Sequence, residues 1–315
     1  MFKKFRKGRT RELRAGLHME QQSVALAVVK REPQGKLRLE HWFCDSAEDA
    51  EAAAESAWAS IGRVELRRAP LNAVMPAGEY QLLQVEAPDV PEEELPAAVR
   101  WRIKNLLEYP VNDAVVDVFR MPEQSNAAHR PMLYSVSAST VKVNEHAKRM
   151  NSSGFELDAI DIPELCIRNV AGLLPQDAHG VAFLYFAPDY GILTVTRAGL
   201  LHLVRRIEFG RSSLESLQGD DFGTRELLSG ISLEIQRSLD YYESHYDRRT
   251  ISDLVLGPGL TVDTVATTLK EDLGLNVQSL DLNDYLETEQ PLAPEDQGNC
   301  LLAVGAALRL EKAAA

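Results

Sequence analysis

Hydrophobic and polar residues alternate through the first part of the chain. Residues 13–30 contain two alternating runs on either side of a polar turn at 20–23, and a third run at 37–43 follows Gly35. A period of two is typical of strands that bury one face, so these runs predict a hairpin and a third strand. Asp45 or Ser46 is then expected to cap an Ala- and Glu-rich helix that ends near Ser60.

A change of composition follows further strand segments at 70–83. Prolines and three consecutive glutamates occupy 88–94, and a helix is predicted over 91–109. Its apolar stripe has helical spacing and consists of Leu95, Val99, Ile103 and Leu106. Strands at 114–119 and 132–138 and a helix that ends at Gly154 complete a predicted βαββα-like insert.

The remaining sequence predicts a second strand-rich unit. A short helix at 164–174 precedes three apolar runs joined by tight turns, which indicate an antiparallel meander over 181–208. A long helix then carries apolar residues at spacings of three or four, namely Leu228, Ile231, Ile235, Leu239, Tyr242 and Tyr246. A βαβ-like ending covers 254–280, and the last helix is predicted at 301–310.

Together these patterns predict an α/β protein with four parts. A basic arm covers 1–14, an inserted domain covers 85–154, and a second lobe covers 179–299. The first lobe is assigned to 15–84, together with 155–178 and a C-terminal helix over 300–312.

The charge of the chain is unevenly distributed. The net charge is −13, but residues 1–14 carry seven basic side chains against Glu12 alone. An acidic body repels nucleic acid, so nucleic-acid binding is not expected. The arm, which also contains Phe2 and Phe5, is either a contact for anionic lipid headgroups or a solvated tail.

The cysteines and apolar stretches exclude some classes of protein. Cys44, Cys166 and Cys300 lie far apart in sequence, so we expect three reduced thiols and neither a disulfide framework nor a zinc site. The apolar stretches at 180–204 and 300–310 are interrupted or too short to span a membrane, and neither a membrane helix nor a secretory signal is expected.

Four segments carry a resemblance to a known family. They read AVRWRIKNLLEYPVNDAVVDVF from Ala98, NSSGFELDAIDIPELCIRNVAGLL from Asn151, EIQRSLDYYESHY from Glu234 and LLAVGAALR from Leu301. In this order they resemble the PilM and FtsA branch of the actin-like superfamily, and within it the MshI-like proteins of mannose-sensitive hemagglutinin pili. The resemblance implies a two-lobed actin-like (ribonuclease-H-like) ATPase fold, with a small α+β domain of the PilM type inserted in the first lobe.

The resemblance also indicates that the phosphate side of a nucleotide site is degraded. His18 stands where the family has a metal-side aspartate, and Glu20 stands where it has a turn glycine. In the second hairpin, Tyr185 and Ala187 replace the corresponding aspartate and glycine. We therefore expect no catalytic residue and no hydrolysis. His18 and Glu20 could share one face of a strand, but no third metal ligand is indicated, so no metal site is expected.

The adenosine side departs less from the family. Gly257 and Gly259 follow a strand, and Arg237 and Ser238 lie on the helix that flanks the base in related proteins. These four residues are the candidate nucleotide site, with ATP as the only candidate ligand. The alternative is that Gly-Pro-Gly is a structural turn.

The implied function is a non-catalytic cytoplasmic scaffold that is peripheral to the inner membrane. PilM-like proteins hold the cytoplasmic tail of a bitopic, PilN-like inner-membrane protein, and the pilus assembly ATPase is a further candidate partner. On the helix over 91–109, Trp101 lies off the apolar stripe and is a candidate anchor, supported by Arg100 and Asn105. The alternative places Trp101 against the first lobe.

Two other functions remain open at this point. One is a nucleotide-dependent ATPase or kinase of the actin superfamily. The other is the cytoplasmic domain of a type II secretion platform protein, which normally continues into a membrane helix, whereas this chain ends at Ala315.

Overall fold

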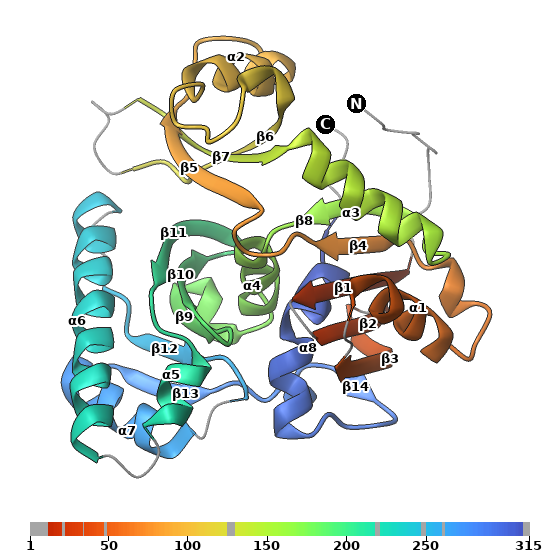
Figure 1. Ribbon diagram of the computed structural model, residues 1–315. Coiled ribbons are helices and arrows are strands. Elements are labelled where there is room, and N and C mark those ends of the chain that lie inside the picture. Colours follow the sequence, from red (N-terminus) through yellow and green to blue (C-terminus); the bar gives the residue numbers. More distant parts are fainter. Residues whose placement is uncertain are drawn as a thin grey trace.

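The computed structural model has two lobes that lie side by side and a small domain above them (Figure 1). It describes residues 12–20, 23–33, 35–46, 49–124, 130–217, 221–246, 250–259 and 262–310. Most of the predicted basic arm, residues 1–11, lies outside this part of the chain.

A six-stranded mixed sheet forms the first lobe, in the order β14-β3-β2-β1-β4-β8. Its strands are β1 (Leu13–Glu20), β2 (Ser23–Arg31), β3 (Leu37–Ser46), β4 (Leu71–Val74), β8 (Leu157–Asp161) and β14 (Glu287–Thr288). The predicted hairpin and third strand are confirmed, since β1, β2 and β3 pair antiparallel. Helix α1 (Ala50–Ser60) begins later than predicted, because β3 continues to Ser46 and Asp49 accepts the N–H of Ala52 at 2.8 Å.

The inserted domain has the predicted βαββα order. It consists of β5 (Tyr80–Glu86), α2 (Leu95–Arg102), β6 (Ala114–Arg120), β7 (Met132–Ser139) and α3 (Thr140–Ser152). Its sheet has the order β5-β7-β6, so it begins at Tyr80, before the predicted boundary at residue 85.

Helix α2 is shorter than the predicted helix over 91–109. Leu95, Val99 and Ile103 are buried against the sheet, but Leu106 is 58% exposed. The chain reverses direction after Ile103, and Arg100 holds the returning segment by donating to the carbonyl oxygens of residues 111 and 112. The apolar spacing continued beyond the length of helix that the small sheet can cover.

The second lobe contains the predicted meander in a five-stranded sheet of order β11-β10-β9-β12-β13. Its strands are β9 (Val181–Phe186), β10 (Gly191–Arg197), β11 (Leu200–Ile207), β12 (Asp253–Leu256) and β13 (Asn276–Ser279). Helices α5 (Arg211–Ser216), α6 (Asp221–His245) and α7 (Val262–Leu273) accompany this sheet. All six apolar residues predicted for the long helix are buried, five of them on α6 and Tyr246 just after it.

Two helices fill the space between the lobes. Helices α4 (Pro163–Ala171) and α8 (Pro294–Ala307) share one apolar core with residues of β2 and β9. Helix α8 therefore begins before the predicted residue 300. Strand β14, which precedes α8, pairs with β3. The stretch just before α8 therefore lies with the first lobe, whereas the predicted boundary at residue 299 assigned it to the second lobe.

The cysteine prediction is wrong for two of the three residues. Cys44 on β3 and Cys300 on α8 form a disulfide, whereas Cys166 on α4 is free and buried. Sequence spacing did not indicate this pair because 256 positions separate the two residues. Within the described ranges, no helix is both long and apolar enough to span a membrane.

Candidate functional site

Polar side chains of the chain itself occupy the place where the two lobe hairpins meet. Glu20, at the end of β1, lies beside Tyr190 in the turn between β9 and β10. The guanidinium carbon of Arg206 lies 4.2 Å from the centre of the Tyr190 ring. Burial raises the pKa of the Glu20 carboxyl, and Asp189 raises it further. A group that carries negative charge here, such as a phosphate, would face Glu20.

The two residues at the positions where the resembled family has aspartates are both buried. Tyr185 is buried in the core between the lobes, where burial raises the pKa of its hydroxyl. His18 is also buried, its Nε2 lies 3.8 Å from Oε2 of Glu20, and burial lowers its pKa to about 4. Across the described residues, no group of three or more His, Cys, Asp or Glu side chains could hold a metal ion.

Two of the four predicted adenosine residues donate hydrogen bonds within the chain. Gly257 donates its N–H to the carbonyl of Leu184 at 2.8 Å, and the hydroxyl of Ser238 donates within α6 to the carbonyl of Glu234 at 2.7 Å. Arg237 is exposed.

The Gly-Pro-Gly turn packs directly against the beginning of α8. Gly259 has a φ of +92°, and a Cβ added to it would lie 3.0 Å from Cα of Gly298. Both the left-handed backbone and this close approach require glycine. The turn therefore has a structural reason that involves no ligand.

A groove lies between the inserted domain, the first lobe and the end of α8. The groove, here called the insert groove, has a volume of about 480 Å³. Its walls include Asp117, Phe119 and Val136 of the insert, Ile160 and Leu165 of the first lobe, and Arg309 after α8. A second cavity of about 440 Å³ shares Arg31, Arg309 and Leu310 with it, so the two hollows adjoin.

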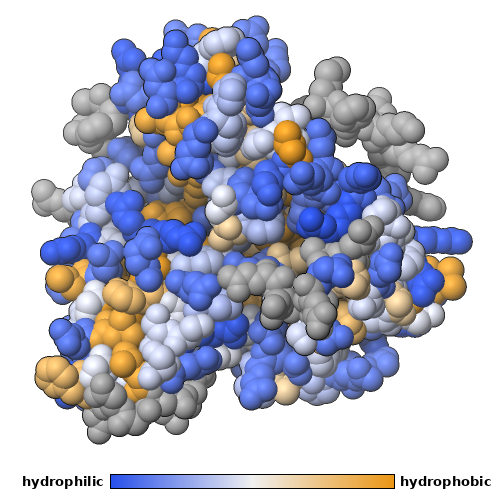
Figure 2. All heavy atoms as spheres, in the orientation of Figure 1, coloured by the Kyte–Doolittle hydropathy of each residue, from blue (hydrophilic) through white to orange (hydrophobic). Residues whose placement is uncertain are grey.

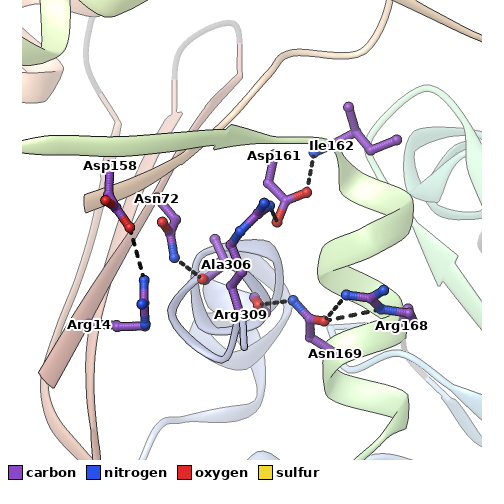
Figure 3. Close-up of polar contacts among 10 residues, drawn as sticks. Arg14, Asn72, Asp158, Asp161, Ile162, Arg168, Asn169, Ala306 and Arg309 are labelled. Atoms are coloured by element: carbon purple, nitrogen blue, oxygen red, sulfur yellow. Dashed lines mark hydrogen bonds and ion pairs between the residues drawn. The ribbon is translucent and has the colours of Figure 1, made fainter. Parts of the chain in front are cut away.

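Hydrogen bonds join the end of α8 to β4, β8 and α4, beside the insert groove (Figure 3). Arg309 donates to Oδ2 of Asp161 at 2.8 Å, and the N–H of Ile162 donates to Oδ1 of the same carboxylate at 3.1 Å. Asn72 and Asn169 donate to the carbonyl oxygens of Ala306 and Gly305, at 2.9 and 2.8 Å. Side chains of β4 and α4 thus satisfy carbonyls that the end of α8 leaves without helical partners.

The predicted partner residues lie outside the insert groove. Trp101 is 60% exposed, which excludes its burial against the first lobe. Helix α2 packs on one face of the insert sheet, whereas Asp117 and Phe119 line the groove from the other face. Arg100 is engaged by its own domain, and Asn105 is exposed in the turn after α2.

The groove residues escaped the sequence analysis for a clear reason. They come from β6, β7, β8, α4 and the chain after α8, which are distant in sequence. The available signal was the alternation in β6, where Asp117 and Phe119 lie opposite the apolar face that contacts α2.

No protein-family model and no curated protein matches the sequence. Among solved structures, the chain is similar to the PilM-PilN type IV pilus biogenesis complex, with a TM-score of 0.73 and 16% identity over 94% of this chain and 99% of that one. It is also similar to the cytoplasmic domain of EpsL, an inner-membrane component of the type II secretion system of Vibrio cholerae, with a TM-score of 0.50 and 10% identity over 93% and 94% of the two chains. The ethanolamine utilization protein EutJ of Carboxydothermus hydrogenoformans gives a TM-score of 0.51 and 11% identity over 94% and 89%.

These similarities establish the predicted fold. A Bacteroides thetaiotaomicron protein with an actin-like ATPase fold also matches, with a TM-score of 0.50 and 8% identity over 88% and 93% of the two chains. The chain has the two-lobed actin-like fold with an inserted domain of the PilM type.

Proposed function

We propose that this protein is a non-catalytic scaffold of type IV pilus assembly, of the mannose-sensitive hemagglutinin type. In this proposal, the insert groove holds the cytoplasmic tail of a PilN-like inner-membrane protein, and this contact keeps the scaffold at the inner membrane. The observation that carries the proposal is the groove itself, because its mixed apolar and charged walls suit a peptide. Its volume of about 480 Å³ lies within the range of ligand sites.

Phe119 is the aromatic side chain that contributes to the wall of the groove. It stacks on Tyr134 with ring centres 5.1 Å apart, so its position is fixed before a partner arrives. Rigid aromatic side chains are common anchors at interfaces.

The first test therefore removes this ring. Phe119→Ala is expected to weaken binding of a synthetic peptide of the partner's tail by ~2 kcal/mol, about thirtyfold, in a fluorescence-anisotropy titration. Trp101→Ala is the matched control, since it removes an exposed aromatic from the opposite side of the insert sheet and is expected to leave the affinity unchanged. The reverse result would place the tail on α2.

Trp101 remains a candidate anchor for a different partner. Its exposed ring lies on α2, where the pilus assembly ATPase could dock without competing for the groove. Arg100 would then serve that surface by holding the chain after α2, and Asn105 would lie beside it.

The absence of catalysis is supported by the contacts between the two hairpins. Glu20, at the position where the resembled family has a turn glycine, lies beside Tyr190, and the backbone of α8 lies against the Gly-Pro-Gly turn. The purified chain is expected to show no magnesium-dependent release of phosphate from ATP and no thermal shift with the nucleotide. Turnover that is abolished by Tyr185→Ala would instead favour the ATPase or kinase alternative.

The type II secretion alternative makes a different prediction about the partner. The cytoplasmic domain of such a platform protein normally continues into its own membrane helix and would not need a separate bitopic tail. Membrane fractionation separates the two functions, because the pilus scaffold should sediment with membranes only when the PilN-like protein is co-expressed.

A further inference from the structure

The strand that borders the insert groove has an unpaired edge. Strand β6 is the last strand of the sheet β5-β7-β6, and no described strand lies on its outer side. Strand β8 is the last strand of the six-stranded sheet of the first lobe, but it contributes only Ile160 and Asp161 to the groove. Three consecutive residues of β6 line the groove, Asp117, Val118 and Phe119, so the groove extends from the face of the sheet to the open edge of β6, which presents backbone donors and acceptors.

The register of β6 shows which backbone groups point outward. Met121 donates its N–H to the carbonyl of Met132, and bonds to β7 recur at every second residue along this antiparallel pair. The odd-numbered residues of β6 therefore bond to β7. The residues whose N–H and C=O face the outer edge are Val116, Val118 and Arg120.

One of these outward groups is occupied by the neighbouring side chain. The carboxylate Oδ1 of Asp117 accepts the N–H of Val118 at 2.8 Å. Asp117 is exposed and lines the groove, so this carboxylate lies where the carbonyl of an additional strand would accept the same N–H. A charged side chain that covers an edge in this way also opposes pairing with a second copy of the sheet.

We propose that the partner's tail binds as an additional strand on β6, and that Asp117 holds the N–H of Val118 until the tail replaces it. This inference rests on the proposed function, because it takes the tail as the occupant of the insert groove. An extended peptide that adds to a sheet edge obtains affinity from main-chain hydrogen bonds, while its alternate side chains enter pockets. Here one row of its side chains would face Phe119 and Leu165.

The test is the effect of removing the competing carboxylate. Asp117→Ala is expected to bind the synthetic tail peptide about fivefold more tightly, which corresponds to ~1 kcal/mol, because the Val118 N–H no longer has to leave an internal acceptor. Asp89→Ala removes an exposed aspartate of the same domain and controls for the change in net charge.

Hydrogen exchange measured by NMR on the complex supplies an independent readout. The amides of Val116 and Val118 are expected to be protected at least tenfold when the peptide is bound, and N-methylation of the peptide should reduce affinity at every second residue. Binding with neither protection nor this alternation would overturn the strand model and leave the proposed function intact. A peptide that fails to bind even the unaltered chain would overturn both.

Discussion

Gly305→Ala is expected to lower the free energy of unfolding by about 3 kcal/mol or more, the upper range for overpacking a core. Gly305 lies on α8 where this helix crosses α4. A Cβ at this position would overlap the carbonyl oxygen of Cys166 and lie 2.7 Å from its carbonyl carbon. Because both contacts are with backbone, the two helices have to separate, and they form the centre of the core shared by the lobes.

The measurement is urea unfolding followed by circular dichroism, with a matched glycine on another helix as control. Gly230 is exposed on α6, and a Cβ added there would have no neighbour within 4 Å. Gly230→Ala should stabilise the protein by up to about 1 kcal/mol, because alanine favours the helix. Equal effects of the two substitutions would show that α4 and α8 are not packed as closely as the structure indicates.

The strands could be predicted because their signal is local. β1 and β2 are short apolar runs on either side of a polar turn, a signal visible within a few residues although both faces of β2 are buried, and in β9 and β10 tight turns fix the order of the strands. The helix stripe of α6 is equally local, since one helix buries one face along its whole length.

The candidate site could not be predicted because its parts meet only in the folded chain. Asp117 and Arg309 line one groove although almost two hundred positions separate them. The segment that contains α2 resembled a longer helix because its apolar spacing continues to Leu106, which the structure leaves exposed beyond the end of α2. The edge of β6 was likewise hidden, since the order of strands in a sheet depends on pairing and not on the sequence of one strand.

The last prediction concerns two buried histidines and acid stability. Burial lowers the pKa of both His18 and His146 to about 4, and neither nitrogen of the His146 ring has a hydrogen-bond partner in the described structure. An unfolded histidine binds a proton near pH 6.5, so between pH 6.5 and 4 the unfolded chain holds protons that the folded chain does not. The free energy of unfolding therefore decreases as the pH falls through this window. The stability that the two neutral histidines contribute is fully present above pH 6.5.

The size of the effect follows from the shift of one ring. A difference of about 2.5 pKa units corresponds to ~3 kcal/mol for a single isolated histidine. His146→Leu replaces a ring that makes no hydrogen bond, so it should remove ~2–3 kcal/mol of the loss of stability between pH 7 and 4. The exposed His179 provides the control substitution, His179→Leu.

Two carboxyls of low exposure act in the opposite direction and have to be separated from the histidines. Burial raises the pKa of Glu20 and of Glu164, so the folded chain takes up their protons before the unfolded chain does, and this uptake favours folding as the pH falls. The unaltered protein reports only the sum of the two effects. The difference between His146→Leu and the unaltered chain, measured by urea unfolding at pH 7, 6, 5 and 4, isolates the histidine. If the two curves run parallel over this range, His146 is protonated in the folded state and its burial is not as the structure places it.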